Sequence, residues 1–158
     1  MANTQSMCTS FMGELMTATH NFGTAPTRGT SAADTFKGAL YLASATINAS
    51  TTAYSTTGEV TGTGYSAGGV TVTNATPPTA TNASTTAGVA YWTPSASLTY
   101  TSVTLTTAFD AVLIYNSTQS NKAVSVHTFG SQTITAGTFT LTMPANTTST
   151  ALLRLATT

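Results

Sequence analysis

Beyond Thr35, apolar residues recur at every second position in short segments that turn-forming residues separate. This period of two is typical of strands with one buried face, and turns about every ten residues are typical of a β-sandwich, jelly roll or barrel. Threonine, about a quarter of the chain, suits such strands because its branched Cβ favours extended backbone. We therefore predict a mainly β protein with a β-sandwich, jelly-roll-like body over residues 35–158. The predicted strands are 35–43, 70–73, 85–92, 98–107, 111–116, 123–129, 132–135, 138–143 and 150–156.

Four of these segments allow finer predictions. The apolar positions change parity within 98–107, which predicts a β-bulge near residues 101–102. Segment 111–116 (AVLIYN) is continuously apolar, as expected for a central strand covered on both faces. Segments 132–135 and 138–143 flank Ala136 and Gly137, which predicts a hairpin there. The predicted core comprises Leu40, Leu42, Val112, Ile114, Phe139 and Leu141.

The N-terminal region has a different periodicity. Met7, Phe11 and Leu15 recur every four residues, which predicts a helix near residues 5–20 with one apolar stripe. Residues 23–34 are rich in Gly, Pro, Ser and Thr and predict a loop. We expect residues 1–34 to form a helix and arm. Its stripe, our candidate interface, packs either on its own body or in a groove of a partner.

Charged residues make up only 5% of the chain, with 4 cations and 4 anions. Four scattered cations do not form a nucleic-acid or polybasic membrane surface. No apolar run is long enough for a transmembrane helix, and the start MANTQSMC does not resemble a signal peptide. With the single Cys8, we expect synthesis in a reducing cytoplasm without disulfides. A surface with so little charge favours association, with other protein or with itself as a homodimer or homotrimer.

No motif predicts an enzyme, and we expect no catalytic, cofactor-binding or metal site. The glycine-rich stretch 62–69 lacks the strand–turn–helix context of a dinucleotide loop. Cys8 and His20 lie more than three helical turns apart, and His127 has no acid nearby in sequence. The four acids are too dispersed to indicate a metal site or a carboxylate pair. Thr-X-Thr triplets begin at 71, 99, 104, 133 and 138 without a common period, which argues against an ice-binding solenoid.

Several stretches resemble small virion proteins of tailed bacteriophages. They are FKGALYLASATINASTTAYSTTGEVTGTGYSAGGVTVTN (36–74), FDAVLIYN (109–116), SVHTFGSQTITAGTFTLTMP (125–144) and TALLRLA (150–156). The resemblance covers most of the chain from Phe36 onward. It implies a capsid decoration or cement protein, with a jelly-roll or related β-sandwich body on the surface of the virion head. The implied partner is the major capsid protein, which such a protein binds and stabilises.

Two other functions remain open. The chain is alternatively a tail, fibre or head–tail junction component, which copy number would distinguish from cement. A different class is a carbohydrate-binding β-sandwich that uses Tyr91, Trp92 or Tyr100, if these aromatic side chains share an exposed face.

Overall fold

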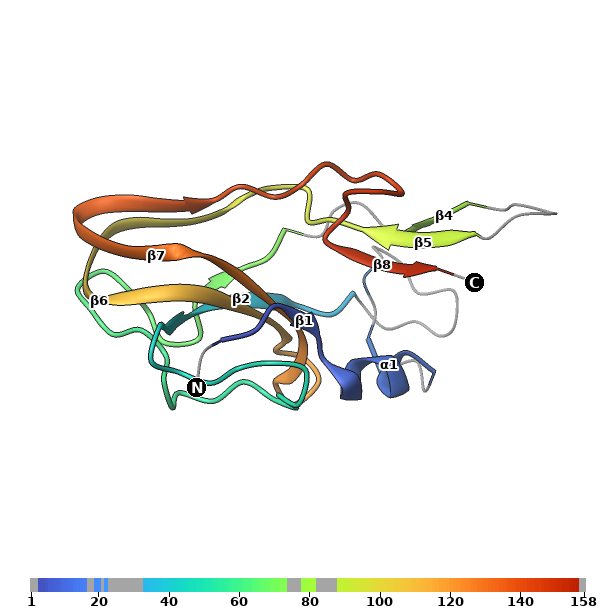
Figure 1. The fold of residues 1–158 in the computed structure, drawn as a ribbon, viewed down its shortest axis with the longest axis horizontal. Helices are drawn as coiled ribbons and strands as arrows, with labels where there is room; N and C mark the ends of the chain where they lie inside the picture. The colour runs from blue at the N-terminus through green and yellow to red at the C-terminus, as the bar shows by residue number, and fades with distance from the viewer. Residues whose placement is uncertain are drawn as a thin grey trace.

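A computed structural model describes residues 3–16, 19–20, 22, 33–73, 78–81 and 88–156, without the side chains of residues 12, 13 and 16. Its elements are short except for two long strands (Figure 1). They are β1 (Ser6–Met7), α1 (Thr9–Met16), β2 (Phe36–Leu42), β3 (Val70–Thr71), β4 (Thr79–Ala80), β5 (Val89–Trp92), β6 (Leu98–Asn116), β7 (Lys122–Leu141) and β8 (Leu153–Ala156).

The strands form two antiparallel sheets. One has five strands in the order β1-β7-β6-β2-β3, and the other has three in the order β4-β5-β8. The prediction of a mainly β, sandwich-like body with one N-terminal helix is confirmed for the described residues.

The long strands β6 and β7 pair along their length and fold back on themselves (Figure 1). This one hairpin therefore forms two layers, the half that lies beside β2 and a half that is folded over it. Gly38 of β2 pairs with Ile114 in the second half of β6, yet Leu98 and Tyr100 from the first half also contact it. The Tyr100 hydroxyl donates to the Gly38 carbonyl at 2.8 Å. A methyl group on Gly38 would lie 2.6 Å from Leu98 Cδ1, so only glycine allows the layers to approach this closely. We call the folded-over part, residues 98–109 and 132–141, the outer ribbon.

Besides a register shift between Leu105 and Phe109, the outer ribbon contains two bulges that compensate each other. An extra residue on β6, Ser102 with φ 54°, shifts the register between Tyr100 and Val103. An extra residue on β7, Ala136 with φ 48°, restores the register before Leu105 pairs with Ile134. The predicted bulge near 101–102 is thus confirmed. The predicted hairpin at 136–137 is wrong, because a bulge lies there and β7 continues through it.

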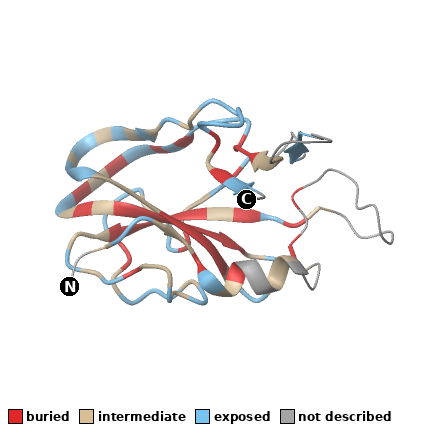
Figure 2. Ribbon diagram, turned by 45° about the vertical axis from the view of Figure 1, so that its right-hand side comes forward, coloured by how far each residue is buried: buried red, intermediate tan, exposed pale blue. Residues whose placement is uncertain are grey.

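The core lies between the layers and against α1 (Figure 2). Every residue of segment 111–116 is buried, which confirms that it is a central strand, although it is continuous with 98–107. Of the predicted core, Leu40, Val112 and Ile114 are fully buried, whereas Leu42, Phe139 and Leu141 are half-buried at its margin.

The N-terminal helix is shorter than predicted, because the preceding residues adopt an extended conformation. Ser6 and Met7 pair with β7 as strand β1, and the Cys8 amide donates to the Val124 carbonyl at 3.0 Å. The Asn3 side chain donates to Asp110 Oδ1 at 2.6 Å and accepts from the Ile47 amide. The described part of residues 3–22 therefore packs on the body, and Cys8, Phe11 and Phe22 belong to its core. The boundary at residue 34 stays a prediction.

Candidate functional site

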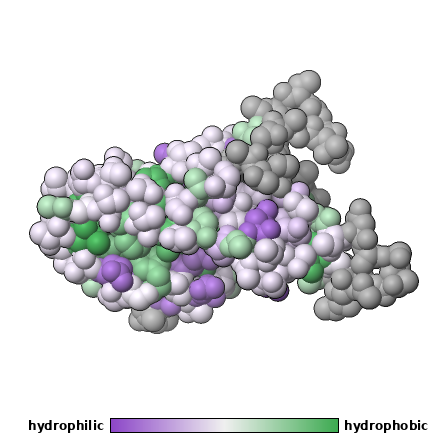
Figure 3. Space-filling view, turned by 90° about the horizontal axis from the view of Figure 1, so that it is seen from above, coloured by the Kyte–Doolittle hydropathy of each residue, from purple (hydrophilic) through white to green (hydrophobic). Residues whose placement is uncertain are grey.

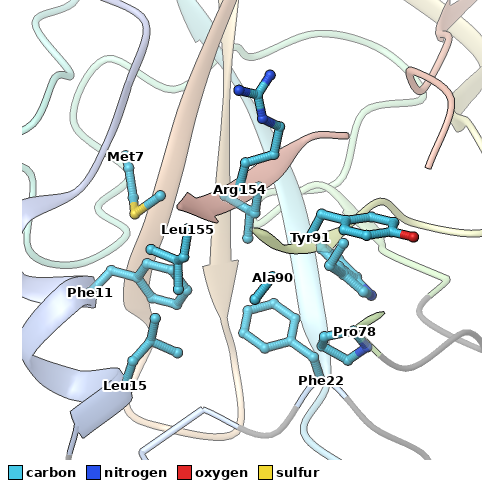
Figure 4. A pocket seen from close by; sticks show the side chains of 11 residues that line it. Met7, Phe11, Leu15, Phe22, Pro78, Ala90, Tyr91, Arg154 and Leu155 are labelled. Carbon is cyan, nitrogen blue, oxygen red and sulfur yellow. The ribbon is translucent and has the colours of Figure 1, made fainter. Parts of the chain in front are cut away.

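Two adjoining cavities lie where the N-terminal segment faces β8. The first, about 90 Å³, is almost wholly apolar and lies between α1 and the three-stranded sheet (Figure 4). The second, a cleft of about 360 Å³, is partly polar and runs between β1 and the segment that leads into β8. The cleft is lined by Gln5, Ser6, Met7, Ser125, Val126, His127, Ala151, Leu152, Leu153 and Arg154.

All three predicted interface residues line the apolar cavity. Phe11 is only 2% exposed and packs edge-on against the ring of Phe22, with centroids 5.9 Å apart. Met7 and Leu15 are half-buried and point toward Leu155 of β8 (Figure 4). Phe11 therefore packs on its own subunit, while Met7 and Leu15 keep part of their surface accessible. Docking of this stripe on a partner stays a prediction.

A polar network that the sequence did not indicate fixes α1 to the body. Lys122 Nζ donates to Glu14 Oε1 at 2.7 Å, and His20 Nε2 lies 2.7 Å from Glu14 Oε2. On the other ring edge, the Asn116 amide donates to His20 Nδ1 at 3.1 Å and to Asp34 Oδ2 at 2.7 Å. Burial alone would raise the pKa of the Glu14 carboxyl, but Lys122 and His20 outweigh it and hold that pKa below its usual value. No sequence signal links residues this far apart.

His127 and Ser125 line the cleft from β7. The Ser125 hydroxyl lies 2.8 Å from His127 Nε2, a distance that a serine nucleophile and its base would also show. Burial lowers the pKa of His127 to about 4, so the ring is neutral at neutral pH. No described carboxylate hydrogen-bonds to this ring, and Ser125 is only 1% exposed. We therefore interpret the pair as a structural contact.

Cys8 has the environment expected of an unreactive thiol. It is fully buried, and burial followed by the charge of Glu14 raises its pKa to about 11. Such a thiol stays protonated at neutral pH and is therefore unreactive as a nucleophile. Within the described ranges, no three His, Cys, Asp or Glu side chains are grouped as metal ligands would be.

Glu59 occupies the centre of a tyrosine cluster. Its carboxylate accepts from the Tyr54 hydroxyl at 2.6 Å, the Tyr65 hydroxyl at 2.8 Å and the Gly68 amide at 2.7 Å. Burial, and then the Glu59 charge, raises the pKa of Tyr115 to about 12. One buried carboxylate thus ties parts of the irregular segment 43–69 to each other. Backbone hydrogen bonds join the segment to the sheet, for example from the Val60 amide to the Leu40 carbonyl and from the Ala123 amide to the Thr52 carbonyl.

A broad uncharged surface covers the outer ribbon. Its two segments, 98–109 and 132–141, contain no charged residue, and the view from above is mostly near-neutral in hydropathy (Figure 3). The compensating bulges keep the threonines of both strands pointing outward, with Thr99 directly opposite Thr140. We call this surface the threonine face. The exposed threonines of the outer ribbon are Thr99, Thr101, Thr106, Thr107, Thr133, Thr135, Thr138 and Thr140.

The aromatic side chains proposed for sugar binding do not share an exposed face. Trp92 and Tyr100 are only 2% and 3% exposed, and Tyr91 is half-buried beside the apolar cavity. Stacking on a sugar requires accessible ring faces, which the two buried rings do not offer.

Comparison with known proteins found no matching family model, no similar curated protein and no similar solved structure. Within the described part of the chain, no helix is long and apolar enough to span a membrane.

Proposed function

We propose that this chain is a structural protein of a tailed-bacteriophage virion, a decoration or cement protein that binds the major capsid protein on the surface of the shell. The observation that carries the proposal is the threonine face. It is exposed, uncharged and built on two paired strands, so a partner can cover it without desolvating a charge. The resemblance of the sequence to phage virion proteins gives the partner.

The internal hydrogen bonds of the four acidic residues also support attachment through an uncharged surface. All four are hydrogen-bonded within the subunit, Glu14 to Lys122, Asp34 to Asn116, Glu59 to Tyr54 and Asp110 to Asn3. Attachment to the shell then depends on apolar contacts of the threonine methyl groups and on hydrogen bonds from the threonine hydroxyls and the strand backbone. Each contact of this kind is weak, but many of them on one shell together give a high avidity.

The test is retention on purified particles in a salt series, with electron microscopy to count copies. The Debye length falls from about 10 Å at 0.1 M to about 3 Å at 1 M salt. We expect retention throughout this range and release by mild urea. Thr140→Glu should lower occupancy, whereas Thr57→Glu, on an exposed turn in the segment 43–69, should not. Release by salt alone would contradict the proposed mode of binding. A few copies at the tail or neck would indicate instead a tail, fibre or head–tail junction component.

A further inference from the structure

The open edge of β8 is a second binding feature, distinct from the threonine face. β8 ends the order β4-β5-β8, so it has a paired side and an open side within the described residues. The Thr81 amide donates to the Val89 carbonyl, so the backbone groups of Val89 and Tyr91 point toward β4 and those of Ala90 and Trp92 toward β8.

The pairing register then fixes which groups of β8 are free. Leu155 pairs with Ala90 and Leu153 with Trp92, so the backbone groups of both leucines point toward β5. The N–H and C=O groups of Arg154 and Ala156 point the other way, and no described residue bonds to them. Unpaired groups at this spacing are complementary to another strand.

The side chains around this edge define what such a strand must carry. Leu153 and Leu155 line the apolar cavity with Met7 and Leu15, and Leu155 is 42% exposed. Arg154 also borders that cavity, but its guanidinium points away from it (Figure 4). A strand paired with β8 would therefore place apolar residues toward Met7 and Leu15, and would place the residue opposite Arg154 beside its guanidinium.

Charge complementarity indicates that the residue opposite Arg154 is acidic. The cleft has one cation, Arg154, a neutral His127 and no carboxylate among its described lining residues. Arg154 donates to the Ser149 carbonyl, and no described carboxylate contacts it. All four acids of this chain are hydrogen-bonded within the subunit, so a second copy would have to give up or share such a bond to supply the missing carboxylate.

We propose that β8 accepts an extended segment of another protein with the pattern apolar–acidic–apolar, which pairs with Arg154 and Ala156 and covers Leu155. This inference rests on the proposed function, because it takes a protein of the capsid shell as the source of the extended segment. Binding of the segment itself is measurable on the isolated full chain without particles.

The probe is a short capped peptide of alternating valine and threonine with one central aspartate, compared with asparagine and lysine peptides by fluorescence anisotropy. Cross-strand charge pairs favour the aspartate peptide over asparagine by about twofold to fivefold at low salt. Arg154→Lys should preserve this order, and Arg154→Glu should reverse it in favour of lysine. Methylation of alternate peptide amides should abolish binding, because it blocks strand pairing.

Ala156→Pro removes an outward N–H and should weaken binding severalfold with little change in the β5 pairing. If that variant unfolds, the Arg154→Glu reversal remains decisive. No binding of any peptide, equal affinity for all three, or unchanged binding after amide methylation would overturn the inference. Peptide binding by a chain that is absent from shells would refute the proposed function and leave the strand-accepting edge intact.

Discussion

Glu59 shows how one side chain holds a long irregular segment. Its carboxylate has three donors, two from tyrosines and one from the Gly68 amide, in a region with no regular strand. Glu59→Ala leaves one buried and two part-buried donors without this partner, and each buried donor that is left unpaired costs about 1–3 kcal/mol. We expect a loss of about 3 kcal/mol or more in the free energy of unfolding, measured in urea. Tyr54→Phe removes only one bond and should cost about 1 kcal/mol. Equal losses in the two variants would argue against a central role for Glu59.

Ile114 lies in segment 111–116 of β6, where every residue is buried. It is fully buried, whereas Leu155 is 42% exposed, so the two residues form a matched pair. Ile114→Ala should cost about 2–5 kcal/mol, as truncations in well-packed cores do. Leu155→Ala should stay within about 0.5 kcal/mol. A loss below about 1 kcal/mol for Ile114→Ala, by denaturant unfolding, would show that the layers do not pack on this residue.

At the scale of elements, the outer ribbon depends on two bulges that cancel. Tyr100 and Leu105 both face inward although they are an odd number of residues apart, and Ile134 and Phe139 on β7 show the same relation. Deletion of Ser102 alone, or of Ala136 alone, should put one strand out of register and expose its apolar face. Deletion of both restores a regular ribbon with the same residues inside. The melting temperature should therefore be higher for the double deletion than for either single one; additive losses would contradict the pairing.

The sequence was sufficient to predict the elements of regular periodicity but not their connections. The parity change at 101–102 indicated a bulge, and the apolar run 111–116 indicated a central strand. The same pattern concealed that 98–107 and 111–116 are one strand, because a bend and a bulge resemble a break when only alternation is considered. The contact of Glu14 with Lys122 and the cleft between β1 and β8 arise from tertiary packing, for which local periodicity has no signal.

At the scale of the whole molecule, stability should depend on pH through His127. The folded form remains neutral down to a pKa of about 4, whereas the unfolded chain has the ordinary value of 6.5. Between these values the unfolded chain binds a proton that the folded chain does not, so stability falls as pH falls from 6.5 to 4. Urea unfolding across this range should show the decline, and His127→Gln should reduce its slope. Below pH 4.5, protonation of Glu14 adds a further loss, because its pKa is lowered in the folded state. An unchanged slope in His127→Gln would contradict this assignment.

The folded-back hairpin also implies an order of assembly. The turn over residues 117–121 joins the ends of β6 and β7, so pairing near Asn116 and Lys122 closes the smallest loop. Pairs farther along, ending with Leu98 and Leu141, close progressively larger loops at increasing entropic cost. Only after the ribbon bends back can Leu98 reach Gly38. We therefore expect the central strands to form early in the folding transition state and the threonine face to form last.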